Sequence, residues 1–327
     1  MIICFSGTGN SLKCALALKE ALPVNWQSLT MISSQNLASP SVTLAAEPDE
    51  PVIWIFPTYS WGVPPIVLRF LEICTCTRPD ALHHAVVTYG DDAGNLASQW
   101  HRRLQRKNLT PGGVYGIRMP NTYTLMKGFD TDPSDIVKEK LAAIPARIAE
   151  IAKAIKAGST LIDITAGKHP WIKTAIIYPY FTRMCMSPRP FHPTTSCVGC
   201  GRCALSCPLS NIKMEADLPH WGNNCALCLR CYHICPHHAV AYGKATKGKG
   251  QYLCPDVQLP SPNKRATPGI ALSWRKGVFC ERHSGGLCEA WVTCGCATEA
   301  VAASFRYKPR KQFRECHNLF GYDGGCN

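Results

Sequence analysis

The 327-residue sequence contains little charge and no long apolar run. Charged residues make up 17% of it, with 22 Asp and Glu against 35 Lys and Arg. The longest apolar stretch, from Trp171 to Met186, is interrupted by two basic residues and a proline, so it falls short of the roughly 18 residues that a membrane-spanning helix needs. No charged segment with an apolar one behind it precedes the strand-like residues at Met1, so we expect neither a signal peptide nor a membrane span, and a cytoplasmic location.

Several functional motifs are also missing. The glycine-rich segment near the N-terminus is not followed by Gly-Lys-Ser/Thr, as in nucleoside-triphosphate loops, and lacks the G-x-G-x-x-G of dinucleotide-binding proteins. No Ser-His-Asp or Cys-His arrangement follows from the spacing of these residues, so hydrolysis and acyl transfer are not expected. The formal charge of +13 comes without a recognition helix or an aromatic RNA-binding signature, so we expect no nucleic-acid partner.

Cysteine, in contrast, is abundant, with 20 residues in the chain. Without a secretion signal these thiols are expected to stay reduced, which favours metal ligation over disulfides. Eight of them form the motif C-x2-C-x2-C-x3-C-P twice, the second copy 28 residues after the first. The eight are Cys197, Cys200, Cys203, Cys207, Cys225, Cys228, Cys231 and Cys235.

The spacing within this motif predicts two [4Fe-4S] clusters. Three thiolates at i, i+3 and i+6 of a tight loop can bind three irons of a cubane, and in two-cluster proteins the fourth cysteine binds the other cluster. One predicted ligand set is Cys197, Cys200, Cys203 and Cys235, and the other is Cys225, Cys228, Cys231 and Cys207. A tetrahedral zinc site is the alternative, because C-x2-C pairs also bind zinc.

The charge around the motif agrees with anionic clusters. Residues 161–260 contain ten Lys and Arg against four Asp and Glu. A [4Fe-4S] cluster with four thiolates carries about two negative charges when oxidised, so two clusters would largely balance this excess. Pro208 and Pro236 bend the chain after the fourth cysteines, while Gly199 and Gly201 allow a close approach of the backbone to the first cluster.

On these residues, the segment from about 192 to 245 resembles the bacterial two-cluster ferredoxins. The resemblance implies a small α+β domain with pseudo-twofold symmetry, one-electron transfer and low reduction potentials. We place this ferredoxin-type domain at residues 191–260.

Residues 1–160 alternate short β-branched runs with helical patterns, which is typical of a doubly wound parallel sheet. Strands are predicted at Met1–Phe5, Val24–Ile32, Val52–Thr58, Ala85–Gly90 and Val114–Met119. Helices are predicted at Asn10–Ala21, Pro65–Ile73, Gly94–Lys107 and Pro133–Ala157.

A phosphate-binding loop is predicted directly after the first strand. Its residues are Ser6, Gly7, Thr8, Gly9, Asn10 and Ser11. The two glycines let backbone N–H groups converge, the hydroxyls can donate hydrogen bonds, and the N-terminus of the following helix favours an anion. The alternative is a helix cap without a ligand, because Ser, Thr and Asn also cap helices.

Two further loops leave the carboxyl ends of predicted strands, where open parallel sheets bind ligands. One contains Thr58, Tyr59, Trp61 and Gly62, and the other contains Tyr89 and Gly90. The three aromatic side chains are candidates to flank a flavin ring, with packing in the core or on the surface as the alternative.

Together the three loops resemble those of the flavodoxin family, whose phosphate loop reads Ser/Thr-x-Thr-Gly-Asn-Thr; this chain ends it with Ser11 instead. The resemblance covers residues 1–160 and implies FMN as the cofactor and a sheet order of 2-1-3-4-5. To about residue 260, the chain looks like the flavodoxin-ferredoxin fusion proteins of anaerobic bacteria, in which electrons pass between the flavin and the clusters.

Two segments fall outside these domains. Residues 161–190 are interpreted as a connector. Residues 261–327 have no sustained helical or strand period, so we expect an irregular, poorly ordered extension. The alternative for this tail is a third metal site formed by Cys280, Cys288, Cys294 and Cys296.

The leading hypothesis is an electron-transfer protein that exchanges electrons with a redox partner protein. One alternative is a flavin-dependent reductase of a small organic substrate, although the flavin loops offer no acid or base beyond Asp91 and Asp92. A second alternative is an iron-sulfur binding or sensor module with an empty flavin site.

Overall fold

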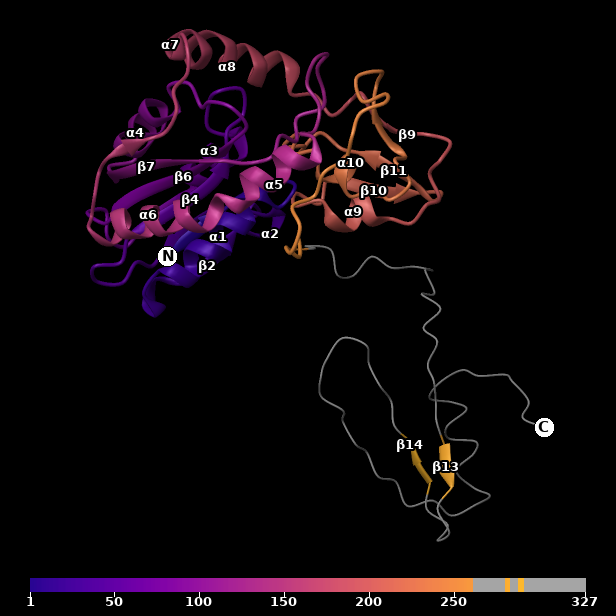
Figure 1. Ribbon diagram of the computed structural model, residues 1–327, viewed down its shortest axis with the longest axis horizontal. Helices are drawn as coiled ribbons and strands as arrows, with labels where there is room; N and C mark the ends of the chain where they lie inside the picture. The colour runs from indigo at the N-terminus through magenta and orange to yellow at the C-terminus, as the bar shows by residue number, and fades with distance from the viewer. Residues whose placement is uncertain (261–279, 283–287, 291–327) are drawn as a thin grey trace, which may run out of the picture. The chain divides into compact units, whose positions relative to one another are not determined.

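The apolar runs near the N-terminus form one parallel sheet in the computed structural model, which describes residues 1–260, 280–282 and 288–290 (Figure 1). Its strand order is β2-β1-β4-β6-β7-β8. The bounds are β1 (Ile2–Cys4), β2 (Leu29–Met31), β4 (Val52–Pro57), β6 (Leu82–Tyr89), β7 (Thr110–Arg118) and β8 (Ile162–Asp163). The expected parallel α/β core is confirmed, and its first five strands follow the order 2-1-3-4-5 expected of a flavodoxin-like sheet.

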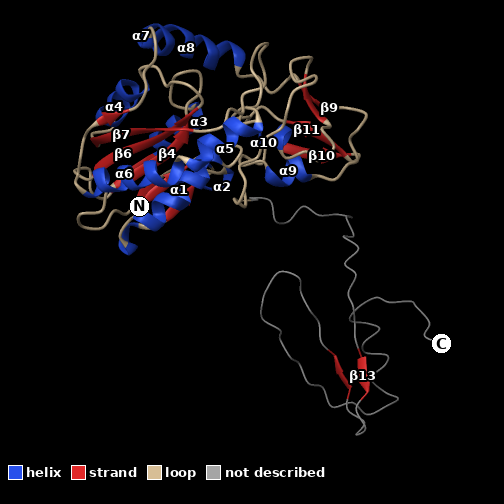
Figure 2. Cartoon of the chain, viewed as in Figure 1, coloured by secondary structure: helices blue, strands red, loops and turns tan. Residues whose placement is uncertain are grey.

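Helices cover both faces of this sheet because the side chains of its central strands alternate between two apolar cores. On β4, Ile53 and Ile55 lie in the core beneath α1 (Asn10–Ala21) and α6 (Ile144–Lys156), whereas Trp54 and Phe56 lie in the core beneath α3 (Pro65–Ile73) and α4 (Leu96–Arg106). A strand buried on both faces reads as a continuous apolar run, as β4 does. Figure 2 shows the strands enclosed between these helices.

The prediction of one helix over residues 133–157 is wrong in one respect: the structure has two helices there, α5 (Ser134–Ala142) and α6. Ala143 separates them, with φ −77° and ψ −14°. Pro145 in the first turn of α6 has no N–H to continue the hydrogen-bond ladder, and in an uninterrupted helix its ring would clash with the carbonyl four residues earlier. The bounds predicted for α1 and α3 are confirmed.

Shorter elements complete the sheet domain. They are η1 (Val24–Trp26, a 3-10 turn), α2 (Ser34–Leu37), and the parallel pair β3 (Val42–Leu44) and β5 (Cys74–Cys76). The edge strand β8 lies in the segment interpreted as a connector; it has only two residues, both exposed, and so gives no strand pattern.

A helical arm follows β8 over residues 170–185. It consists of α7 (Pro170–Ile172), η2 (Lys173–Ile177), α8 (Tyr178–Tyr180) and η3 (Phe181–Cys185), of which η2 and η3 are π-helical. Tyr178 and Phe181 are buried, and the Tyr178 hydroxyl donates a 2.6 Å hydrogen bond to the Val63 carbonyl. The arm therefore packs on the loop that follows β4.

The cysteine motif lies in a small module with the order β-α-β-β-α-β. Its elements are β9 (Phe191–Pro193), α9 (Arg202–Ser206), β10 (Ile212–Glu215), β11 (Leu218–Trp221), α10 (Arg230–His233) and β12 (Val240–Tyr242). β9 pairs antiparallel with β12, and β10 pairs with β11. The two halves of the module repeat the same order of elements around a separate apolar core.

The chain divides into two compact units, Met1–Thr267 and Pro268–Asn327. In the second unit, the described residues form the antiparallel pair β13 (Cys280–Arg282) and β14 (Cys288–Ala290). The expected disorder of the tail and the metal site that includes Cys294 and Cys296 concern residues outside those described. No helix among the described residues is both long and apolar enough to cross a membrane.

Candidate functional site

The loop from Ser6 to Ser11 connects β1 to α1 and presents a row of backbone N–H groups. Within the described residues, the N–H groups from Gly7 to Ser11 have no hydrogen-bond partner. Gly9 takes a φ of 104° at the start of the helix, and the first turn of α1 carries no acidic side chain. Free N–H groups at a helix N-terminus favour an anion such as a phosphate.

The hydroxyls of this loop differ in their roles. The Ser6 hydroxyl accepts a 3.3 Å hydrogen bond from the Leu12 N–H, and the Ser11 and Thr88 hydroxyls lie 2.8 Å apart. The Thr8 hydroxyl has no partner among the described residues, although the residue is 5% exposed. Thr8 is therefore the side chain of the loop that remains available to a ligand.

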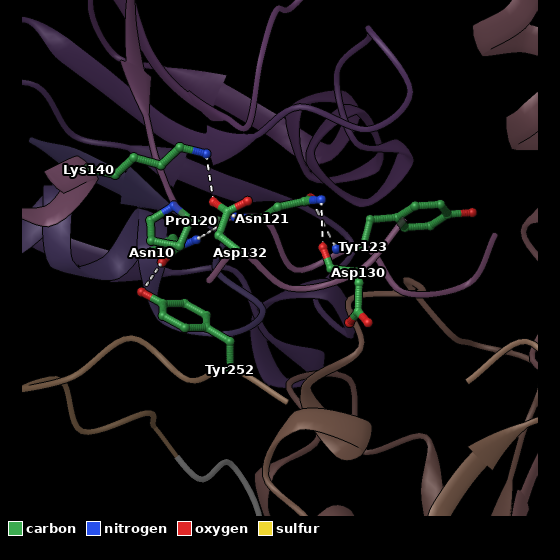
Figure 3. A network of polar contacts seen from close by, with 8 residues as sticks. All are labelled: Asn10, Pro120, Asn121, Tyr123, Asp130, Asp132, Lys140 and Tyr252. Atoms are coloured by element: carbon green, nitrogen blue, oxygen red, sulfur yellow. Dashed lines mark hydrogen bonds and ion pairs between the residues drawn. The ribbon is translucent and has the colours of Figure 1, made fainter. Parts of the chain in front are cut away.

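Asn10 connects the loop to two distant segments (Figure 3). Its Nδ2 donates a 2.9 Å hydrogen bond to the Pro120 carbonyl, and its Oδ1 accepts one of 3.1 Å from the Tyr252 hydroxyl. Asp132 holds the segment at Pro120, because it accepts from the Asn121 N–H and pairs with Lys140 at 2.7 Å. Asn10 thus organises the loop. The sequence did not predict the roles of Pro120 and Tyr252, because no motif near either residue indicates a contact with Asn10.

The loop after β4 forms a tight turn in which Tyr59 and Gly62 exchange backbone hydrogen bonds of 2.9 and 3.0 Å. Ser60 and Trp61 take φ values of 44° and 63°, a left-handed conformation that is costly for both residue types. The helical arm holds this turn, since the Thr174 hydroxyl donates a 2.7 Å hydrogen bond to the Trp61 carbonyl. Strain of this kind is often stored at functional sites.

Tyr89, a predicted candidate to flank a flavin ring, shows the core packing that was the alternative for it. It is 6% exposed and belongs to the apolar core, where its hydroxyl donates a 3.2 Å hydrogen bond to Thr165. Its ring packs against Gly116 of β7, where an added Cβ would lie 2.6 Å from the ring. Tyr59 and Trp61 lie in the loop after β4, and Thr58 and Gly90 lie at the carboxyl edge of the sheet.

The eight cysteines of the motif line two cavities. Cys207, Cys225, Cys228 and Cys231 line the first. Cys197, Cys200, Cys203 and Cys235 line the second. Each cavity takes its fourth cysteine from the other copy of the motif.

Backbone N–H groups point at sulfurs in a repeated pattern. The Asn211 N–H donates to the Cys207 sulfur at 3.4 Å, and the Ala239 N–H donates to the Cys235 sulfur at 3.3 Å. These are equivalent positions of the two copies. The Trp221 indole N–H is buried in the cavity with Cys231 and interacts with the Cys231 thiol. Donors around sulfur are the surroundings that an iron-sulfur cluster uses.

Burial raises the pKa of the Cys203 and Cys225 thiols to about 12. The thiolate is the metal-binding form, so binding at these sulfurs must release protons. No group of three or more His, Cys, Asp or Glu side chains among the described residues is arranged to hold a single metal ion. Four thiolates on a cubane bind four different irons and are spread more widely than ligands of one ion.

The cavity with Cys228 lies directly against the phosphate-type loop. A Cβ added to Gly7 would lie 2.5 Å from the Cys228 carbonyl oxygen. Arg230 donates hydrogen bonds to the Ser6 and Gly7 carbonyls at 2.6 and 2.7 Å. We call these residues, Ser6, Gly7, Cys228 and Arg230, the loop–motif contact.

The segment after β12 returns to the same loop. The Cys254 N–H donates a 2.9 Å hydrogen bond to the Thr8 carbonyl. Cys254 also packs on Gly9, because a Cβ added to Gly9 would lie 2.8 Å from the Cβ of Cys254. His233 of α10 donates to the Thr122 carbonyl at 2.8 Å and accepts from the Tyr252 N–H at 3.1 Å, and burial lowers its pKa to about 4. The sheet domain and the cysteine module therefore share one buried contact region.

No protein-family model and no curated protein matches the chain. Among solved structures, two-electron reduced Megasphaera elsdenii flavodoxin is similar at 15% identity, over 46% of this chain and 98% of its own, with a TM-score of 0.27. The Trp repressor binding protein of Bacillus subtilis is similar at 12% identity, over 44% of this chain and 96% of its own, with a TM-score of 0.27.

The Flv1 flavodiiron core of Synechocystis is similar at 12% identity and a TM-score of 0.26; the match covers 47% of this chain and 36% of that core. These structural neighbours are flavodoxin-like or flavoprotein folds. The fold assignment itself rests on the order and direction of the strands described above.

Proposed function

We propose that this chain is an electron-transfer protein that binds FMN at the loop from Ser6 to Ser11 and a [4Fe-4S] cluster in each cysteine-lined cavity. The loop–motif contact is the observation that carries the proposal. At this contact, Gly7 belongs to a loop suited to a flavin phosphate and packs against Cys228, which lines a cavity suited to a cluster. Bound FMN would exchange one or two electrons, and each cluster one.

The residues present fit both kinds of cofactor. For FMN, the N–H groups from Gly7 to Ser11 and the Thr8 hydroxyl are donors without a partner in the described part of the chain. For the clusters, each cavity offers four cysteines, and the buried Trp221 N–H beside Cys231 adds a hydrogen-bond donor to sulfur. The order of elements in the cysteine module supports the ferredoxin-type interpretation and, with it, a flavodoxin-ferredoxin fusion.

The alternative of a reductase gains no support from the acidic residues near the loops. Asp92 pairs with Lys173 at 2.6 Å and accepts a hydrogen bond from the Gly94 N–H, so it holds the loop to the helical arm. Asp91 is exposed. A role as a carrier, with a second protein as redox partner, needs no acid or base at the flavin.

Anaerobic purification with quantitation of iron, sulfide and flavin tests this function. We expect about eight irons and eight sulfides for each chain, because two cubanes need that number, together with FMN rather than FAD. An optical redox titration would then resolve flavin and cluster transitions. Protein that binds zinc in place of iron, or that binds no flavin when FMN is supplied, would contradict the proposal.

A further inference from the structure

Arg230 lies buried between the two proposed cofactor sites. Its side chain is 1% exposed, in the second cysteine motif between Cys228 and Cys231. The guanidinium donates four hydrogen bonds, all to backbone carbonyls. The acceptors are Ser6 at 2.6 Å, Gly7 at 2.7 Å, Ser206 at 2.9 Å and Pro260 at 3.1 Å.

No carboxylate balances this charge within the residues that the structure describes. Arg230 takes part in none of the ion pairs found there. An arginine keeps its proton even when buried, and an isolated charge inside a protein is costly. Carbonyl dipoles satisfy its N–H groups but supply no net negative charge, so an anion bound beside Arg230 would stabilise it.

The nearest candidates are the two proposed cofactors. Arg230 and three of the second motif's cysteines line the same cavity, which also receives Cys207 from the first motif. A cluster bound there would add about two negative charges. The same guanidinium holds the carbonyls of Ser6 and Gly7, in the loop whose N–H groups suit a phosphate.

The first motif has an arginine at the equivalent position, Arg202, but that residue is exposed. Cys200 and Cys203 flank it as Cys228 and Cys231 flank Arg230. The two motifs therefore have the same spacing of ligands but a different electrostatic environment. Water screens the charge of Arg202, whereas the charge of Arg230 acts at low dielectric.

We propose that Arg230 is a positioning residue that fixes the phosphate loop and makes the adjacent cluster easier to reduce than the cluster beside Arg202. The inference rests on the proposed function. Reduction adds a negative charge to a cluster, and a buried positive charge stabilises the reduced form more than the oxidised form. The cluster next to the flavin thus has the higher potential of the two.

The test is a potentiometric titration of the holoprotein monitored by electron paramagnetic resonance. In the wild type we expect two unequal cluster transitions. Arg230→Gln should lower the equilibrium constant for reduction of the adjacent cluster tenfold or more, which lowers its reduction potential by at least 59 mV for one electron. It should also weaken FMN binding about tenfold, because hydrogen bonds from a charged group to the loop are lost.

Arg202→Gln is the matched comparison; because water screens Arg202, it should shift the cluster beside it much less than Arg230→Gln shifts its own, and it should leave the FMN affinity unchanged. Equal cluster potentials in the wild type, or an Arg230→Gln protein with full iron content and unchanged potentials, would overturn the inference. If the Arg230→Gln protein does not assemble clusters, the Arg230→Lys protein is measured instead. Cluster assembly in Arg230→Lys would support a role for the positive charge. Failure of both variants to assemble clusters would refute that role. Wild-type protein without iron would instead sink the proposed function.

Discussion

Leu227 and Leu229 in the second cysteine motif take the backbone conformation that glycines take in the first. Their φ values are 51° and 58°, against 67° and 69° at Gly199 and Gly201. A left-handed conformation costs a residue with a side chain about 1 to 2 kcal/mol, whereas burying a leucine contributes about 1.5 to 3 kcal/mol. Both leucines are buried, so their packing offsets the strain.

The cysteine lining of the two cavities leads to a prediction about single substitutions. Cys207→Ala should remove or damage the cluster otherwise held by Cys225, Cys228 and Cys231, lowering the iron content from about eight to about four for each chain. Iron analysis and electron paramagnetic resonance would measure this. Damage confined to the other cluster would refute the exchange of ligands, and Cys185→Ala, at an exposed cysteine, is the control.

Trp221 permits a test of the hydrogen bonding around one cluster. Trp221→Phe removes the indole N–H but keeps a ring to stack on Phe191, whose centroid lies 5.5 Å away. Loss of one hydrogen bond, about 1 kcal/mol, should lower the equilibrium constant for reduction of the adjacent cluster roughly fivefold. A redox titration measures this change, and the exposed Trp171→Phe should have no effect. An unchanged potential would mean that the N–H does not reach the cluster.

At the scale of the elements, the phosphate-type loop should control flavin affinity. Thr8→Ala together with Asn10→Ala removes the hydroxyl available to a ligand and the bonds to Pro120 and Tyr252. We expect FMN binding to weaken tenfold or more, since a hydrogen bond to a charged group contributes about 1.5 to 3 kcal/mol. Fluorescence titration of FMN measures the affinity, with the exposed Thr43→Ala as control. Equal affinity in the double variant and the wild type would refute the assignment.

Local sequence was sufficient to predict elements whose signals are local. The start of α1 follows the glycine-rich loop, and α3 starts at Pro65, so both were predicted with the correct bounds. Periodicity failed at α5 and α6, because the apolar spacing continues across the break that Pro145 imposes. The strand β8 was missed because two exposed residues carry no pattern.

The candidate site was predictable in its composition and less so in its contacts. The spacing of the cysteines marked the residues that line the two cavities, because the ligands of each loop are close in sequence. The ring of Tyr89 packs in the core because the alternation of side chains along β6 decides its direction. The role of Arg230 had no local signal, since its partners Ser6 and Gly7 lie more than 220 residues away.

At the scale of the whole molecule, three buried histidines make the fold sensitive to acid. Burial lowers the pKa of His83, His84 and His233 from 6.5 to about 4. The unfolded chain therefore takes up protons below pH 6.5 while the folded chain does not, and stability present above pH 6.5 is lost as the pH falls toward 4. Between pH 7 and pH 5 the loss should be about 2 kcal/mol for each histidine.

Thermal melts over this pH range would measure the effect. The double variant His83→Gln/His84→Gln keeps an acceptor for Trp54 and for the Gly113 N–H but removes two titrating groups. Its melting temperature should depend less on pH than that of the wild type. An identical slope in both proteins would show that these histidines do not determine the acid response.

Truncation after Thr267 tests whether the first compact unit is sufficient for cofactor binding. All residues proposed to bind FMN and the clusters lie between Met1 and Thr267. We therefore expect the shortened protein to keep about eight irons and its FMN. A loss of about four irons would mean that cysteines of the tail bind a cluster.

The hydrogen bond from Tyr252 to Asn10 joins residues 242 positions apart. At a synthesis rate of about 5 to 20 residues per second, roughly 12 to 50 seconds separate the emergence of the glycine-rich loop from that of the segment that completes its surroundings. A sheet domain that folds as it leaves the ribosome therefore waits for the cysteine module before its loop is enclosed. The loop proposed to bind FMN thus reaches its final surroundings only after the cysteine module has been made.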